Sequence, residues 1–214
     1  MTFITTADLE KLIASLEPVA ADQIAAAEAR QLSLTKPPGA LADLETIGNR
    51  LCGVAGCCPP PLPDPARVVV FAADHGVYAQ GVTPWPQEVT LQMAPNIVAG
   101  GAGVNAIAQA TGCQVQVIDV GMKQAVPGVP DRRVRPGTDD IAVGPAMSVD
   151  EAVAAIGVGV TAAREAVAAG VRCLLPGEVG LANTTVAAAL IAVFTGAAAA
   201  EVTGSGAGAQ GEML

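Results

Sequence analysis

The sequence predicts an α/β fold with a parallel sheet and flanking helices, a Rossmann-like three-layer arrangement, preceded by a small N-terminal helical subdomain. Two continuous runs of β-branched apolar residues, 67–73 and 115–120, are typical of strands that are buried on both faces. Segments with helical periodicity separate these runs, and such alternation favours parallel strands joined by crossover helices. A proline-rich stretch at 57–65 sets the helical beginning apart from the strands.

The first part of the chain carries apolar residues at helical spacing. The spacing predicts two helices within 8–32, joined near Glu17 and Pro18 because proline interrupts a helix interior. A rigid loop at 36–39 leads to a third helix at 41–51. We therefore predict an N-terminal helical segment over residues 1–58 and an α/β domain that binds a nucleotide or a base over residues 66–214.

The second part of the chain alternates between strands and helices. After the strand at 67–73, helices are predicted at 87–98 and 103–111, and the strand at 115–120 follows. Ser148 is a suitable N-cap for a long amphipathic helix at 149–169. A short strand at 172–175 and a helix at 184–195 complete the pattern. Ligands of such sheets bind at the carboxyl ends of the strands, so the site belongs to the loops there.

Composition excludes several classes of protein. The 214 residues carry a net charge of −9 and only 2% aromatic residues. A nucleic-acid partner is excluded because phosphate-backbone affinity needs clustered lysine and arginine. The apolar stretch 186–200 is too short for a membrane span, and the N-terminus lacks the features of a signal peptide. Five cysteines without zinc-type spacing indicate free thiols, a cytoplasmic location and no metal site.

Two glycine-containing turns could hold an anion. The stretch 176–185 leaves a strand and enters a helix, where backbone N–H groups and the helix dipole favour a phosphate, with Asn183, Thr184 and Thr185 adding a cap and hydroxyls. Glu178 beside it suits a developing positive charge or an N–H of a bound base. The stretch 203–208 is a second glycine-rich loop. Each is also compatible with an ordinary turn or a flexible tail.

Two further features are ambiguous when taken alone. His75, the only histidine, follows a strand, and a single histidine is more often structural than catalytic. The segment 81–93 combines the only tryptophan, Trp85, with Gln92 and Met93. An aromatic ring, an amide and a thioether suit a flat heteroaromatic ligand. The same residues also fit a plain loop followed by a helix.

Taken in order along the chain, the motifs resemble those of nicotinate-nucleotide–dimethylbenzimidazole phosphoribosyltransferases. The matching segments span almost the whole sequence. They are Lys36-Pro37-Pro38-Gly39, Phe71-Ala72-Ala73-Asp74-His75-Gly76-Val77, Gly81-Val82, Pro86-Gln87-Glu88-Val89-Thr90, Gly100-Gly101-Ala102-Gly103-Val104-Asn105, Val117-Ile118-Asp119-Val120-Gly121, Gly137-Thr138, Gly144-Pro145-Ala146-Met147, Gly177-Glu178, Asn183-Thr184-Thr185 and Thr203-Gly204.

The resemblance implies a reaction and a set of roles. A phosphoribosyl group passes from nicotinate mononucleotide to 5,6-dimethylbenzimidazole or a similar base, which gives α-ribazole phosphate and nicotinate for the lower ligand of cobalamin. It implies a homodimer that needs neither cofactor nor metal, with Glu178 as an auxiliary catalytic residue. The implied base pocket contains Thr83, Trp85, Gln92 and Met93. The implied nucleotide contacts are Gly180, Leu181, Asn183, Thr184, Thr185 and Gly204.

The sequence departs from the family pattern at three places. The general-base glutamate of the family, and a lysine after the second glycine-rich loop, are expected beyond Leu214. Ala182 stands where glycine is usual, and Ser205 stands where arginine is common. The alternative to an active transferase is therefore a catalytically inactive or fragmentary relative that only binds a nucleotide or an aromatic base.

Overall fold

The computed structural model describes residues 4–211, which form two compact units. One unit consists of Glu10–Pro63. The other contains the described residues up to Leu9 together with those from Asp64 onward. Across residues 4–211, every helix is too short or too polar to span a lipid bilayer.

The unit Glu10–Pro63 is helical. Helix α1 (Thr6–Ala14) runs into it, and α2 (Ala21–Ser33) and α3 (Asp43–Ala55) follow. Gly53 of α3 allows close packing, since a Cβ atom there would lie 2.6 Å from Val19 Cγ1. In the intervening loop Lys36 Nζ lies 2.6 Å from Glu45 Oε1. That hydrogen bond lowers the pKa of the Glu45 carboxyl. The helices predicted for this part of the chain are confirmed.

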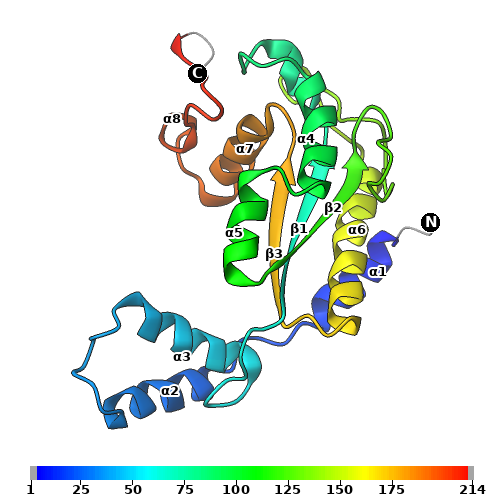
Figure 1. Cartoon of the computed structure of the whole chain (residues 1–214). Coiled ribbons are helices and arrows are strands. Elements are labelled where there is room, and N and C mark those ends of the chain that lie inside the picture. The colour runs from blue at the N-terminus through cyan, green and yellow to red at the C-terminus, as the bar shows by residue number, and fades with distance from the viewer. Residues whose placement is uncertain (1–3, 212–214) are drawn as a thin grey trace. The chain divides into compact units, whose positions relative to one another are not determined.

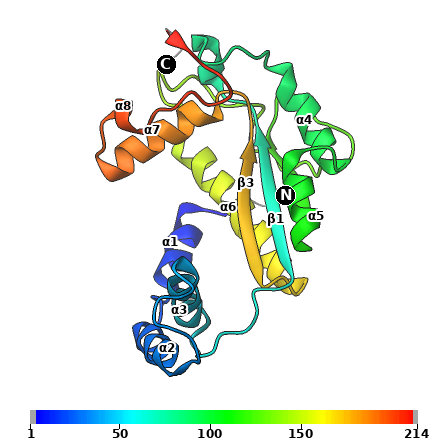
Figure 2. The ribbon, with the colours of Figure 1, turned by 60° about the vertical axis from the view of Figure 1, so that its left-hand side comes forward.

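The larger unit is built on a three-stranded parallel sheet in the order β2-β1-β3. The strands are β1 (Ala66–Ala73), β2 (Gln114–Gly121) and β3 (Cys173–Val179). Val70 in the centre of β1 is paired with Val117 on one side and Gly177 on the other. Figures 1 and 2 show the three strands pointing the same way, so their carboxyl ends meet at one edge of the sheet.

Helices cover both faces of this sheet. Successive strand residues point to opposite faces. Val70 therefore packs with Ala94 and Ile97 of α4 (Glu88–Val98), and α5 (Gly103–Thr111) lies over the same face. Val69 packs on the opposite face against Val158 of α6 (Val149–Ala168). The predicted three-layer α/β class is confirmed.

The predicted cap of α6 is present in full. Ser148 Oγ accepts the Glu151 N–H at 3.2 Å, and Glu151 Oε2 accepts the Ser148 N–H at 2.7 Å. This reciprocal pair satisfies two backbone donors that a helix start otherwise leaves open. The backbone hydrogen bond from Ser148 is the main cause that lowers the pKa of the Glu151 carboxyl.

The third strand differs from the prediction. We expected it to end at Leu175, but β3 continues through Pro176 to Val179. Proline removes a backbone donor, which is tolerated on an edge strand because only one side is paired. β3 is such a strand, since it pairs only with β1 within the described residues. The turn that enters α7 (Asn183–Thr195) therefore begins at Gly180 rather than at Gly177.

The sequence analysis did not predict two short elements that the structure contains. A 3₁₀ helix, η1 (Gly76–Gln80), follows β1, and α8 (Ala199–Val202) follows α7. Both are too short to show the apolar periodicity on which the prediction depends. η1 places the following residues beside the carboxyl ends of the strands (Figure 1), so it matters for the site.

A surface ion pair after β2 gives the fold an acid-sensitive contribution. Arg133 donates to both carboxylate oxygens of Asp131, at 2.9 and 2.6 Å, and this lowers the pKa of Asp131 from 3.8 to about 2. When a carboxyl group has a lower pKa in the folded protein than in the unfolded protein, it stabilises the fold at pH values above the unfolded-state pKa. This stabilisation is lost as the pH falls through the folded-state pKa. For Asp131→Asn we expect a lower urea midpoint than wild type above pH 4, and no difference near pH 2. A difference that is the same at every pH would contradict this expectation.

Candidate active site

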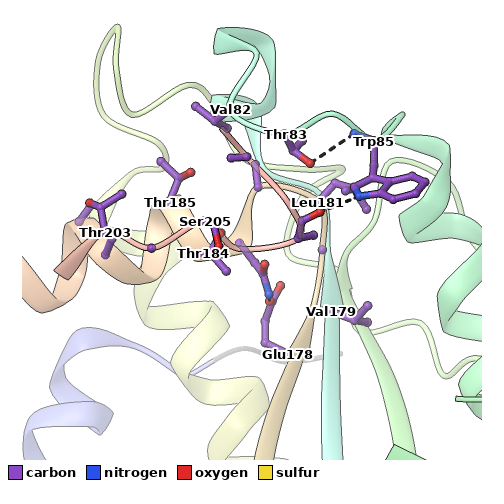
Figure 3. Close-up of a pocket in the computed structure, with 18 of the residues that line it drawn as sticks. Val82, Thr83, Trp85, Glu178, Val179, Leu181, Thr184, Thr185, Thr203 and Ser205 are labelled. Carbon is purple, nitrogen blue, oxygen red and sulfur yellow. Dashed lines mark hydrogen bonds between the residues drawn. The ribbon is translucent and has the colours of Figure 1, made fainter. Parts of the chain in front are cut away.

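A cavity of about 640 Å³ opens beside the carboxyl end of β3. Three segments line it: the loop after η1 with the start of α4, the end of β3 with the first part of α7, and the stretch from α8 to Ala209. All but two of the predicted site residues line this cavity. They are Thr83, Trp85, Glu178, Gly180, Leu181, Asn183, Thr184, Thr185 and Gly204. In Figure 3 Trp85 lies on one side, Thr184, Thr185 and Thr203 on the other, and Glu178 between them at the strand end.

The turn after β3 is packed so tightly that only glycine fits at position 180. A Cβ atom on Gly180 would lie 2.1 Å from the Ala73 carbonyl oxygen and 2.9 Å from both His75 Nε2 and Glu178 Oε1. The next residue is anchored as well, because Leu181 donates its N–H to the buried Thr90 hydroxyl at 3.1 Å. This turn therefore fixes where α7 begins.

The first turn of α7 offers donors to the cavity. Asn183 was predicted as its cap, but the N-cap is Ala182 in a left-handed conformation (φ 72°), and it accepts no side-chain bond. Asn183 instead donates its side-chain N–H to Glu178 Oε2. The N–H of Thr185 is bonded to Ala182 O, whereas that of Thr184 has no acceptor among residues 4–211. A free N–H at a helix start suits an anion.

The second glycine-rich loop lies directly against this helix start. Gly206 has φ +50°, and a Cβ atom there would lie 2.6 Å from Thr184 Oγ1. Trp85 connects the loop to the far wall, because its indole N–H donates to Ala207 O at 2.8 Å (Figure 3). Trp85 is 53% exposed and lines the cavity, so its ring is available to a flat ligand. Segments more than a hundred residues apart in the chain therefore enclose one space.

The charge in the cavity is negative. Glu178 is its only ionisable side chain among the described lining residues, and none of them is a lysine or arginine. Its Oε1 lies 3.0 Å from His75 Nε2. A phosphate here must therefore be held by N–H groups, hydroxyls and the dipole of α7. Within residues 4–211, no group of three or more His, Cys, Asp or Glu side chains is placed to hold a metal ion.

Gln92 and Met93 do not line the cavity. Gln92 is exposed, and Met93 packs against the apolar core between α4 and the sheet. Helical periodicity explains both positions, because α4 turns Thr90, Ala94 and Ile97 inward. Thr90 is a site-supporting residue that the sequence prediction missed. The signal was a polar residue on the buried stripe of α4.

Comparison with known proteins identifies the family. A family model described as Phosphoribosyltransferase matches residues 16–214. The chain belongs to this phosphoribosyltransferase family. The family resemblance inferred from the sequence motifs is thus confirmed.

Individual family members agree in sequence and in structure. The nicotinate-nucleotide–dimethylbenzimidazole phosphoribosyltransferase of Salinispora tropica is 49% identical, and the match covers 94% of this chain and 60% of that protein. The protein of the same name from Chloroflexus aggregans is 46% identical, over 94% of this chain and 57% of its own length. The crystal structure of CobT from Thermus thermophilus matches with a TM-score of 0.82 and 46% identity, covering 90% of this chain and 58% of that one. The chain thus spans somewhat over half the length of these phosphoribosyltransferases.

Proposed function

We propose that this chain forms the nucleotide site of an enzyme that transfers a phosphoribosyl group from nicotinate mononucleotide to 5,6-dimethylbenzimidazole or a similar base. The products are α-ribazole phosphate and nicotinate, as a lower-ligand precursor of cobalamin. The observation that carries the proposal is the convergence of three features on one cavity. These are the first turn of α7, the glycine-rich loop against it, and the exposed face of Trp85. Its volume of about 640 Å³ lies within the range usual for small-ligand sites.

The phosphate belongs at the first turn of α7. The N–H of Thr184, which has no acceptor within residues 4–211, the hydroxyls of Thr184 and Thr185 and the positive end of the helix dipole provide donors without a net charge. Gly204 lines the same space, and a Cβ atom at this position would meet nothing within 4 Å, so a ligand can approach its backbone. Gly180, Leu181 and Asn183 complete the nucleotide contacts in this proposal.

The aromatic rings belong at the opposite wall. Trp85 presents a flat face there, and Thr83 adds a hydroxyl beside it. Val82 and Val89 line the same side and provide apolar contacts for a benzimidazole-type ring. The proposal omits Gln92 and Met93, because both lie outside the cavity.

The chemistry requires little of the protein beyond positioning and charge. A nitrogen of the incoming base attacks C1′ of the ribose, and the C1′–N bond to the pyridinium breaks with its electron pair returning to the nicotinate nitrogen. The other nitrogen of the base then loses its proton to water. Positive charge develops at C1′ in the transition state, and the Glu178 carboxylate at the strand end can stabilise it.

The only tryptophan gives a direct test of binding. Nicotinate mononucleotide should quench the fluorescence of Trp85 in a saturable titration, because a bound pyridinium ring contacts the indole. The double variant Thr184→Ala/Thr185→Ala should weaken that binding by about tenfold, since each hydroxyl lost removes a bond to a charged phosphate. Trp85→Phe is the control for the optical signal. The absence of saturable quenching in the wild type would refute the proposal.

A second candidate, binding without turnover, is favoured by one observation. Both oxygens of Glu178, the only ionisable group among the described lining residues, already accept hydrogen bonds. One assay separates phosphoribosyl transfer from binding alone. In it, 5,6-dimethylbenzimidazole is added to the nucleotide complex, and α-ribazole phosphate is detected by mass spectrometry. Product above the no-enzyme rate supports transfer, and binding without product supports the binding function.

The resemblance also leads us to propose a homodimer. Light scattering coupled to size-exclusion chromatography tests this directly, and a mass equal to one chain at every concentration would contradict it.

A further inference from the structure

Glu178 is held from two sides. Its Oε1 lies 3.0 Å from His75 Nε2, and its Oε2 accepts the side-chain N–H of Asn183. His75 does not line the nucleotide cavity. It lines a second, smaller cavity of about 250 Å³ that Glu178 also borders, and its side chain is only 11% exposed. The imidazole therefore supports the carboxylate from behind, while Asn183 supports it from the helix.

The surroundings of His75 decide which nitrogen carries the proton. Nδ1 is buried and has no hydrogen-bond partner among the described residues. A proton on Nδ1 would leave a buried donor unsatisfied and would turn the Nε2 lone pair toward a carboxylate oxygen. A proton on Nε2 makes a charge-assisted bond to Glu178 and leaves only an unpaired acceptor. Nε2 is therefore the nitrogen that donates to Glu178.

The same geometry decides the state of Glu178. A carboxylate accepts both donated bonds, whereas a protonated carboxyl group would direct an O–H at one of the two donors. Gly180 keeps this arrangement compact, because a Cβ atom there would lie 2.9 Å from both His75 Nε2 and Glu178 Oε1. The Glu178 side chain is still 37% exposed, and it borders the nucleotide cavity as well as the smaller one.

We propose that His75 and Asn183 are positioning residues that hold Glu178 as a carboxylate anion, and that this fixed charge selects nucleotides whose ring is a cationic pyridinium. The selectivity rests on the proposed function. The hydrogen-bond arrangement does not, and it is tested without any ligand. A neutral ring of the same shape would lose the attraction to Glu178 and keep every phosphate contact.

Nitrogen NMR tests the arrangement, because His75 is the only histidine in the chain. The ¹⁵N-labelled protein should show a single imidazole with its proton on Nε2, and Glu178→Ala should shift that Nε2 signal and speed exchange of its proton. A ring protonated on Nδ1 alone, or an Nε2 signal unchanged in Glu178→Ala, would overturn the positioning role.

Calorimetry tests the selectivity with a matched pair of ligands. Nicotinate mononucleotide and its 1,4-dihydro form share the ribose phosphate and differ in the charge of the ring. The wild type should bind the pyridinium form about fivefold more tightly, the size expected for a partly exposed ion pair. Equal affinity would overturn the inference and leave the proposed function intact. If neither nucleotide bound, this result would contradict the proposed function, and the inferred selectivity for the pyridinium form would be contradicted with it.

Two variants of His75 separate positioning from simple packing. His75→Gln retains an N–H that can reach Glu178, whereas His75→Leu fills the space without a donor. We expect the preference for the pyridinium form to survive largely in His75→Gln and to fall toward unity in His75→Leu. The same loss of preference in both variants, with folding retained, would indicate a packing role and overturn the proposal.

Discussion

Gly180→Ala is expected to destabilise the protein by roughly 2–3 kcal/mol and to abolish measurable nucleotide binding. The added methyl group would lie 2.1 Å from the Ala73 carbonyl oxygen. Because that neighbour is backbone, relief requires the end of β1 or the turn before α7 to move. Either movement displaces Glu178 and the first turn of α7, which carry the carboxylate and the N–H and hydroxyl donors of the proposed site. Urea denaturation and fluorescence titration of Trp85 measure the two effects.

A glycine in open space provides the matched control. Gly159 lies within α6, and a Cβ atom there would meet nothing within 4 Å. Gly159→Ala should stabilise the protein by roughly 0.5–1 kcal/mol, because alanine is the better helix former. It should leave nucleotide binding unchanged. If Gly180→Ala proved as stable as Gly159→Ala, the tight turn described here would be incorrect.

Asp119→Ala is expected to cost roughly 2–4 kcal/mol, since two buried donors would lose their acceptor. Asp119 is 1% exposed at the end of β2, and its Oδ1 accepts the N–H groups of Gly121 at 3.0 Å and Met122 at 2.8 Å. Its Oδ2 lies 3.4 Å from Arg133 Nε. The carboxylate therefore fixes the point at which the chain leaves β2.

Asparagine separates the role of the acceptor from that of the charge. Asp119→Asn retains an Oδ1 that can accept both N–H bonds and loses only the attraction to Arg133. Burial raises the pKa of the Asp119 carboxyl, so removing its charge also removes a desolvation cost. We expect Asp119→Asn to lose less than half as much stability as Asp119→Ala in urea denaturation. Equal losses would show that the charge, and not the acceptor, stabilises this turn.

The strands and long helices could be predicted because their signals are local. β1 and β2 are apolar on both faces, and α6 begins with a serine cap followed by Glu151 three residues later. The end of β3 could not be predicted in the same way. Pro176 and Gly177 normally end a strand, and only the position of β3 at the edge of the sheet makes them acceptable there.

The sequence indicates which residues gather around the cavity where backbone chemistry brings them together, and not where packing decides their orientation. The glycines and hydroxyls around Thr184 are visible in the sequence, and they lie together in the cavity. The orientation of Met93 depends on which face of α4 meets the sheet, and a motif cannot supply that information. The indole bond to Ala207 joins residues 122 positions apart, so no local pattern could reveal it.

The backbone conformation of Ala182 explains the effect of having alanine at this position. The sequence has alanine where the motif resemblance leads us to expect glycine, and the structure places this alanine at φ 72°. A side chain in the left-handed region costs about 1–2 kcal/mol. The departure therefore affects the conformational energy of the turn in addition to the space beside the ligand.

The absence of lysine and arginine from the described lining of the cavity determines how the protein responds to ionic strength. A phosphate held by neutral donors loses little affinity when salt is added, unlike a phosphate held by ion pairs. The chain carries a net charge of −9, so an anionic nucleotide approaches against a repulsive field, and salt weakens that field. If the proposed nucleotide binds here, we expect it to associate faster at high ionic strength than at low ionic strength, the reverse of the behaviour of phosphate sites built on cationic side chains.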